Sequence, residues 1–245
     1  MLNIDGMKPS RLILLLLILS IPYTWLIAEN KMTKDTRLKI SHINKDFPVT
    51  ELQNTAWKSA KLVSIHNYWS GVEAPVGRHA KARMLWSDAA IYIQFEANQD
   101  EPLVVSDPPD LTSKTLGLWD RDVCELFIAP DKDKRNRYFE FEIAPNGEWV
   151  DLGIEVLPAK RETDWDYRSG MESKAVIKDK KIVMAIRIAW KALGSTPKAG
   201  DIWLGNLFRC VGRDPTRGYL AWRPTETKEP SFHVPDKFGE FEFVK

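Results

Sequence analysis

A tryptophan, three acidic residues and a β-rich apolar run stand together at residues 118–130, which read LWDRDVCELFIAP. Trp119 precedes Glu125 by six positions, and the apolar run around Glu125 stops at Pro130. Because an unpaired carboxylate is costly to bury, Glu125 must reach solvent, pair with a cation or accept hydrogen bonds from a ligand. An aromatic side chain beside such a carboxylate makes this segment the first candidate for a binding site.

The composition argues against a nucleic-acid partner. The chain has 245 residues, a formal net charge of +1 and a sequence pI near 7.7, so it carries no global field that would attract a polyanion. Ten tryptophans contribute to an aromatic content of 11%. Surplus aromatic residues often line sites for flat, partly apolar ligands, so the composition favours a small-ligand site.

No catalytic residue is predicted. The four histidines show no metal-ligand spacing, and the chain contains no Gly-x-Ser-x-Gly elbow, Walker loop or His-Glu-x-x-His motif. Acidic residues do recur two positions apart, which places each pair on one face of a strand; these pairs are Asp120 with Asp122, Glu140 with Glu142, and Glu240 with Glu242. Such alternation is typical of the solvated face of a half-buried sheet, although it leaves a two-carboxylate glycoside hydrolase open.

The beginning of the chain has the pattern of a targeting segment. Lys8 and Arg11 precede an apolar run that ends at Ala28, which predicts a signal peptide or an uncleaved signal anchor over residues 1–28. Residues 29–46 are interpreted as a polar tether, with a first edge strand as an alternative, and residues 47–245 as one domain. The folded part is therefore expected in an extracytoplasmic compartment, as a secreted, periplasmic or outward-facing anchored protein.

Alternating residues and turn signals predict an all-β domain. Hairpins are expected at residues 80–96, 137–156 and 173–189, and the Asn146-Gly147 pair marks the turn of the second. A single helical turn is predicted at residues 190–193, and a long loop at residues 98–117 is expected to deliver Trp119 to the rim of the domain. The fold class is predicted to be an antiparallel β-sandwich of jelly-roll or immunoglobulin-like type.

Beyond these patterns, an ordered series of segments resembles the family 9 carbohydrate-binding modules. The series covers roughly residues 47–245 and comprises Trp57, IYIQF at 91–95, LWDRDVCELF at 118–127, YFEFEIAPNG at 138–147, WLGNLFR at 203–209, WRP at 222–224 and Phe238-Gly239. The resemblance implies a non-catalytic β-sandwich that holds the end of a sugar chain between two tryptophans. By position, Trp119 and Trp222 are implied as the two walls and Glu125 as the acid that binds hydroxyl groups, followed by Asn206 and Arg209.

The residue types agree with this implied function. A sugar ring presents apolar C–H faces and a rim of hydroxyl groups, so its site needs aromatic walls and fixed carboxylate, amide and guanidinium partners. Two features differ from the expected pattern. Asn206 and Arg209 have opposite parity along one strand, and Tyr219 stands three residues before Trp222, where sugar-binding members tend to carry an amide. Four of the other tryptophans are assigned to the core: Trp57, Trp86, Trp190 and Trp203.

Several alternatives stay open at this point. A Cys124–Cys210 disulfide is allowed in an exported protein but is not required, because free cysteine also behaves as a small buried hydrophobic residue. The resembled family often bears calcium, and oxygen ligands are offered without a fixed loop spacing by Asp100, Asp107, Asp110, Asp120 and Asp122. A haem-binding electron-transfer sandwich would draw its axial ligands from Met171, Met184 and His233. The expected partner is an oligo- or polysaccharide, with a separate glycoside hydrolase as a further partner.

Overall fold

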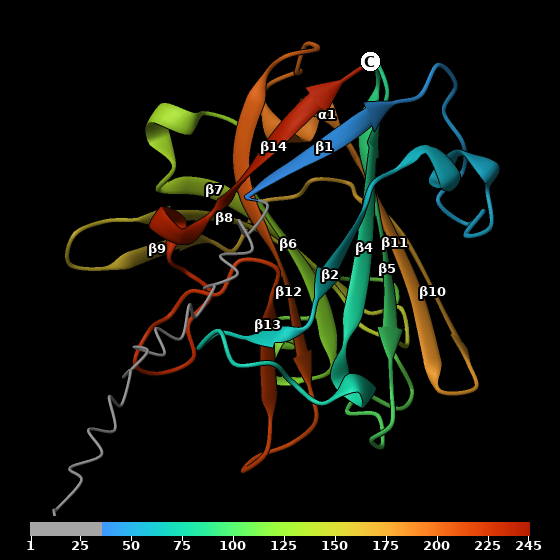
Figure 1. Cartoon of the computed structure of the whole chain (residues 1–245), viewed down its shortest axis with the longest axis vertical. Helices are drawn as coiled ribbons and strands as arrows, with labels where there is room; N and C mark the ends of the chain where they lie inside the picture. The colour runs from blue at the N-terminus through green and yellow to red at the C-terminus, as the bar shows by residue number, and fades with distance from the viewer. Residues whose placement is uncertain (1–35) are drawn as a thin grey trace, which may run out of the picture. The chain divides into compact units, whose positions relative to one another are not determined.

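The computed structural model describes residues 36–245, which form a predominantly β structure built on one large, curled, mixed sheet of fourteen strands (Figure 1). The predicted export or anchor segment, residues 1–28, lies outside the described residues, as does the beginning of the predicted tether. Across residues 36–245, no helix has the length and apolarity that crossing a membrane would require.

The strands fall into two halves joined by a seam. The first half contains β10 (Glu172–Lys178), β11 (Lys181–Ala189), β5 (Ala90–Asn98), β4 (Ala80–Trp86) and β2 (Leu62–Ile65). The second half contains β12 (Ile202–Val211), β6 (Val123–Ala129), β7 (Arg137–Ile143), β8 (Trp149–Val156) and β9 (Arg161–Asp164), together with β13 (Gly218–Ala221) and β3 (Asn67–Tyr68). Strands β1 (Arg37–His42) and β14 (Gly239–Val244) form the seam between them.

The seam corrects two expectations. Strand β1 runs parallel to both β14 and β4, so the sheet is mixed rather than purely antiparallel. The sequence favours a polar tether or an edge strand at residues 37–42, whereas β1 has a paired neighbour on each side. The alternation explains the difference, because Leu38 and Ile40 are fully buried while Arg37 and Lys39 face solvent.

Local turn chemistry produced the expected hairpins. β4 pairs with β5, β7 with β8 and β10 with β11, all antiparallel. Gly147 adopts a positive φ of 94° in the turn between β7 and β8. The predicted helical turn is α1 (Trp190–Leu193), and it ends at Gly194, whose φ of 65° is the left-handed conformation that terminates helices.

Short 3-10 turns connect the strands. They are η1 (Thr55–Ser59), η2 (Val76–Arg78), η3 (Leu118–Asp120), η4 (Lys132–Lys134) and η5 (Pro235–Lys237). The turn η3 is the one that matters for the site, because it carries Trp119 at the end of the long loop that precedes β6.

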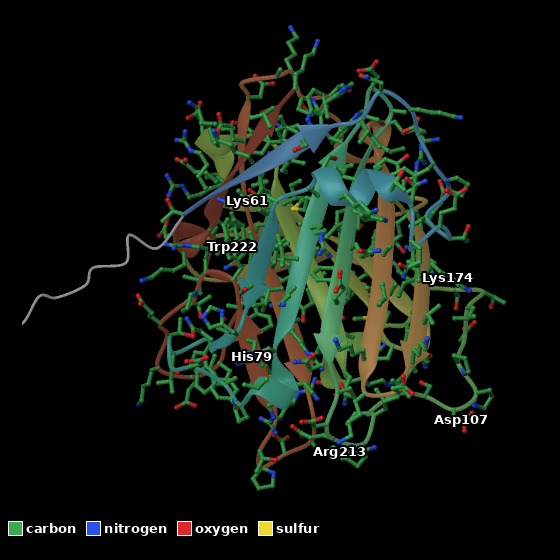
Figure 2. All side chains as sticks on the ribbon, turned by 45° about the vertical axis from the view of Figure 1, so that its right-hand side comes forward. Lys61, His79, Asp107, Lys174, Arg213 and Trp222 are labelled. Atoms are coloured by element: carbon green, nitrogen blue, oxygen red, sulfur yellow. The ribbon has the colours of Figure 1, made fainter. Side chains whose placement is uncertain are left out.

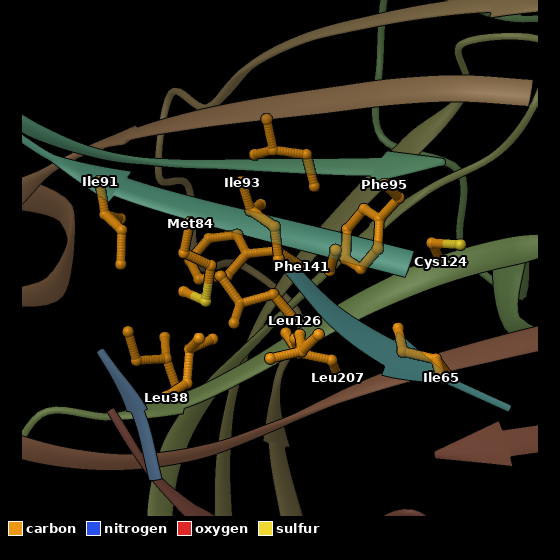
Figure 3. Close-up of a cluster of buried hydrophobic side chains, with 14 of the residues drawn as sticks. Leu38, Ile65, Met84, Ile91, Ile93, Phe95, Cys124, Leu126, Phe141 and Leu207 are labelled. Carbon is orange, nitrogen blue, oxygen red and sulfur yellow. The ribbon is translucent and has the colours of Figure 1, made fainter. Parts of the chain in front are cut away.

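The main hydrophobic core fills the space between the two halves of the sheet. Figure 3 shows side chains from both halves meeting there, among them Ile93 of β5, Phe141 of β7 and Leu207 of β12. The four tryptophans assigned to the core from the sequence are all buried: Trp57, Trp86, Trp190 and Trp203. A second cluster lies on the opposite face of the β12–β6–β7–β8 half, and it contains Phe127, Tyr138 and Phe208.

The two cysteines are free and buried. Cys124 belongs to the core between the halves, whereas Cys210 belongs to the cluster on the opposite face. In the β12–β6 ladder Cys124 pairs with Arg209, and Cys210 pairs with Val123. Because adjacent residues of a strand face opposite sides of the sheet, the two thiols lie on opposite faces. The disulfide that the sequence allowed is therefore not formed.

Candidate functional site

A pocket of about 300 Å³ lies on the outer face of the β12–β6–β7–β8 half, and both Trp119 and Glu125 line it. Glu125 is on β6, Glu140 is on β7 and Cys210 is on β12, so three neighbouring strands supply the floor. Larger hollows of about 790 and 1290 Å³ occur elsewhere, but none of the five sugar-binding residues predicted from the sequence lines them. The pocket that holds the Trp119 and Glu125 segment is therefore the candidate site.

Aromatic side chains form much of the wall. The rings of Trp119 and Trp165 are 6.1 Å apart between centroids and tilted by 44°. Tyr219 and Phe232 also line the pocket, with their ring planes at 74° to each other. Trp165 is 45% exposed, which is unusual for so large an apolar ring and leaves its face available to a ligand.

Arg217 fixes the backbone that carries Trp119. One guanidinium nitrogen, Nη2, donates to the carbonyl oxygens of Trp119 and Arg121, each at 2.6 Å, and Nη1 donates to the carbonyl of Gly212 at 2.8 Å. The guanidinium also lies over the ring of Tyr219, 5.4 Å from its centroid. Arg217 thus ties the turn η3 to the segment that carries a second aromatic lining residue.

Three glutamates meet beneath the pocket. Glu140 and Glu142 are two residues apart on β7 and so share a face, and Glu142 pairs across the ladder with Glu125. One carboxylate oxygen from each lies within 4.8 Å of the others, and all three residues are buried. Cys210 Sγ donates to Glu125 Oε1 at 3.4 Å.

Burial controls the protonation of this cluster. It raises the pKa of Glu125 to about 8, and the neighbouring charge of Glu140 adds to the rise. Burial likewise raises the pKa of Glu140 and raises that of Glu142 well above its usual value. The neighbouring charges of Glu125 and Glu140 add to the rise in the pKa of Glu142, because like charges disfavour ionisation.

His233 lies beside the cluster as a neutral ring. Its Nδ1 is 2.7 Å from the hydroxyl of Tyr138, and its Nε2 is 4.0 Å from Glu140 Oε2. Burial, together with the positive charge of Arg161, lowers the pKa of His233 to about 3. Met184, another candidate haem ligand, lies in the core between the halves, whereas His233 lines the pocket on the outer face.

Trp222 lies outside the pocket. Its ring stacks on Phe241 at 5.7 Å and 12°, and it packs so closely on Gly239 that a Cβ there would lie 2.6 Å from the ring (Trp222 is labelled in Figure 2). Strand alternation accounts for this placement: Leu220 and Trp222 face the main core, whereas Tyr219 faces the pocket.

Asn206 and Arg209 are also absent from the pocket lining. Both atoms of the Asn206 amide bond the backbone of Arg223, with Nδ2 donating to its carbonyl at 2.8 Å and Oδ1 accepting from its N–H at 3.0 Å. Arg209 is buried on the face opposite Glu125, where it donates to the carbonyl of His79 at 3.0 Å and to Gln99 Oε1 at 2.7 Å. The structure therefore groups Trp119 with Glu125 and separates the other three predicted residues from them.

The aspartates considered for calcium do not gather in one place. Asp122 accepts hydrogen bonds from the N–H groups of Val104 and Gly212, and Asp110 accepts from Thr112 and Ser113. Within residues 36–245, one group of side chains has the arrangement of metal ligands, namely the three glutamates beneath the pocket.

Trp165 is the lining residue that the sequence reasoning missed. It stands between Asp164 and Asp166 in a polar segment. Trp119 is likewise followed by the charged residues Asp120 and Arg121, so charged neighbours are a sequence signal that could have nominated Trp165.

Comparisons with known proteins identify the family of the chain. A family model described as "Carbohydrate family 9 binding domain-like" matches residues 50–245. An extracellular protein of Arthroderma benhamiae is 25% identical over 177 residues, which cover 66% of this chain and 77% of that protein.

Solved structures share the fold at low sequence identity. A putative carbohydrate-binding protein from Bacteroides uniformis has a TM-score of 0.68 at 16% identity and covers 84% of this chain and 98% of its own. A family 9 carbohydrate-binding module from Caldicellulosiruptor kristjanssonii, also 16% identical, was solved with cellotriose and with glucose. Its TM-scores are 0.61 and 0.60, the matches cover 85% and 84% of this chain, and they cover 93% and 95% of the module.

Proposed function

Because the chain belongs to the carbohydrate family 9 binding domain-like family, we propose that it is a non-catalytic carbohydrate-binding domain whose site is the pocket of Trp119 and Glu125. The observation that carries the proposal is the meeting of an aromatic wall with buried carboxylates in one pocket of about 300 Å³. A sugar ring stacks its C–H face on an aromatic ring while its hydroxyl groups bond polar side chains.

Each lining group has a place in this proposal. Trp119 supplies one wall, which Trp165 extends because its ring lies against that of Trp119, and Tyr219 supplies the facing surface in place of Trp222. The carboxyl groups of Glu125 and Glu140 lie at the floor, where a hydroxyl group can donate to them. Arg161 and Asp120 at the rim add one donor and one acceptor.

Glucose and β-linked glucose oligomers are the first ligands to test, because a family member of the same fold was solved with glucose and with cellotriose. The predicted export segment and the extracellular relative support a site of action outside the cytoplasm. We propose that the domain works there beside a separate glycoside hydrolase or at the cell envelope.

Calorimetric titration with glucose and cellotriose tests the proposal. We expect binding by the wild type, and Trp119→Ala should weaken it at least tenfold, which corresponds to about 1.4 kcal/mol. Glu125→Gln, which keeps the volume but replaces the carboxyl group by an amide, should also weaken binding. Trp222→Ala is the matched comparison, because it removes a tryptophan from outside the pocket.

Two results would contradict the proposal. One is a folded wild-type protein that gives no heat with any sugar of a mono- and oligosaccharide panel. The other is binding that survives Trp119→Ala but is lost in a folded Trp222→Ala variant, which would move the site to the second wall implied by the sequence.

A further inference from the structure

The carboxylates beneath the pocket have an arrangement that sugar binding alone does not explain. Glu125, Glu140 and Glu142 come from adjacent strands and point to one place, with one oxygen of each within 4.8 Å of the others. A sugar in the pocket can reach Glu125 and Glu140, which line it, but Glu142 lies deeper and is not part of the lining.

Glu142 is the most unusual member. It is 0% exposed, and neither of its oxygens has a hydrogen-bond donor in the protein. Glu140 Oε2 also lacks a donor. Buried carboxylates normally accept hydrogen bonds or pair with a cation, so two such side chains aimed at a third carboxyl group must either carry protons or hold a positively charged occupant.

The surrounding side chains do not supply that positive charge. The His233 ring is neutral, and its Nε2 remains 4.0 Å from Glu140 Oε2. Cys210 donates one weak bond, to Glu125. Asp120 at the pocket rim adds negative charge near Glu142. The guanidinium groups of Arg161 and Arg217 act on Glu140 and Glu125 through space, without a direct bond to either carboxyl group.

The ligand chemistry selects a hard cation. Carboxylate oxygens prefer calcium, magnesium or manganese, and calcium binds oxygens at about 2.3–2.6 Å. Two oxygens bound to one calcium ion can be separated by at most about twice that distance. The 4.8 Å limit within the cluster is compatible with this span.

We propose that Glu125, Glu140 and Glu142 together bind one divalent cation, for which calcium is the best fit, at the floor of the pocket. Three carboxylates leave several of the six to eight calcium positions to other oxygens. Because Glu125 and Glu140 line the pocket, these positions face its interior, where water occupies them or a sugar hydroxyl replaces it. The hydroxyl contact rests on the proposed function, whereas the cation site does not.

The test uses cation alone. The full-length protein is treated with a chelator, dialysed and titrated calorimetrically with calcium, and thermal unfolding is recorded with and without the ion. We expect one calcium per chain and a higher unfolding temperature, because an ion that binds only the folded state stabilises it. Glu142→Gln should weaken calcium binding at least tenfold. The control Glu172→Gln, an exposed acid on β10, should leave calcium affinity unchanged.

The outcomes separate this proposal from sugar binding. Absence of heat and of a temperature shift with calcium, magnesium and manganese at millimolar concentrations would overturn the cation site, whatever the sugar titrations show. Equal calcium affinity in wild type and a folded Glu142→Gln variant would overturn it as well. If Glu142→Gln does not fold, Glu140→Gln replaces it. Calcium binding without sugar binding would support the cation site and contradict only the proposed function.

Discussion

At the scale of single residues, Arg217 controls the position of the aromatic wall. Its guanidinium holds two carbonyl oxygens of the turn η3 and lies over Tyr219, so it connects two lining rings without lining the pocket itself. We expect Arg217→Met to weaken sugar binding by roughly threefold to tenfold, since misplaced groups lose affinity even when they remain present. Calorimetry on the variant measures the change.

A partial recovery of sugar affinity in Arg217→Lys would distinguish a positioning role of Arg217 from general destabilisation of the fold. Arg217→Lys keeps one charge and a donor, so its affinity should fall between those of wild type and Arg217→Met, while both variants unfold at similar temperatures. Arg213→Met is the control, because Arg213 is exposed in the loop before β13 (Figure 2). Unchanged affinity in Arg217→Met would show that η3 holds Trp119 without this contact.

His233 gives the protein a specific sensitivity to acid. The folded pKa of about 3 lies below the ordinary value of 6.5, so the unfolded chain binds a proton between these pH values while the folded protein does not. Stability attributed to the neutral ring is therefore present above pH 6.5 and is lost as the pH falls towards 3. The free energy of unfolding should decrease by about 2 kcal/mol between pH 7.5 and pH 5 because of this residue.

The comparison with His233→Asn isolates this effect from other titrating groups. Urea unfolding of both proteins at pH 7.5 and pH 5 should show a smaller acid-induced loss in the variant. An equal decrease in the free energy of unfolding in the two proteins would mean that His233 accepts a proton in the folded state near its ordinary pKa.

At the scale of structural elements, a buried ion pair holds two loops beside the pocket. Lys114 Nζ, on the long loop before η3, donates to the carbonyl of Tyr167 at 2.8 Å and lies 3.3 Å from Asp151 Oδ1 on β8. Asp151 Oδ2 accepts from the N–H and hydroxyl of Ser169. The Trp165 segment is therefore fixed to the loop that carries Trp119.

Removing one charge of the Lys114–Asp151 ion pair should lower the free energy of unfolding. Asp151→Asn leaves the Lys114 ammonium buried without its counter-charge, and we expect destabilisation of about 3 kcal/mol in urea unfolding. Lys114→Met removes the complementary charge. The free energy of unfolding of the double variant should fall by clearly less than the sum of the two single decreases, because neither charge is left buried without its partner. Additive losses would show that the two side chains act independently.

The hairpins and the Trp119 and Glu125 pair could be predicted because their signals are local. Asn146-Gly147 specifies its turn within a few residues, and Glu125 follows Trp119 within one short segment. The place of Trp222 could not be predicted, because it depends on which face of β13 meets the pocket. That face is set by pairing of Tyr219 with Cys210, a contact between distant positions.

Trp165 and β1 were missed for related reasons. The position of Trp165 depends on the Lys114 contact with a segment far along the chain. Strand β1 looked like a tether because a strand buried on one face contains as many polar as apolar residues. Its main partner, β14, lies about 200 residues away: Leu38 pairs with Phe241.

At the scale of the whole domain, β1 joins the two halves of the sheet. It pairs over five positions with β14 and over two with β4, and it adds Leu38 and Ile40 to the core between the halves (Figure 1). Burial of each side chain contributes about 1.5–3 kcal/mol, and loss of the strand also exposes the edges of both neighbours. The stability of the domain therefore depends on a segment whose sequence fits either a tether or an edge strand.

A chain that begins at residue 47 should consequently be much less stable than one that begins at residue 36. We expect a decrease of on the order of 10 °C in unfolding temperature, or aggregation through the uncovered edges, measured by circular dichroism and light scattering. Within the longer chain, Leu38→Ala should cost about 2–5 kcal/mol, whereas the exposed control Lys39→Ala should change stability by less than about 0.5 kcal/mol. Equal unfolding temperatures for the two chains would show that the halves close on each other without β1, and that the core contacts of β4, β6 and β12 suffice to hold the pocket in place.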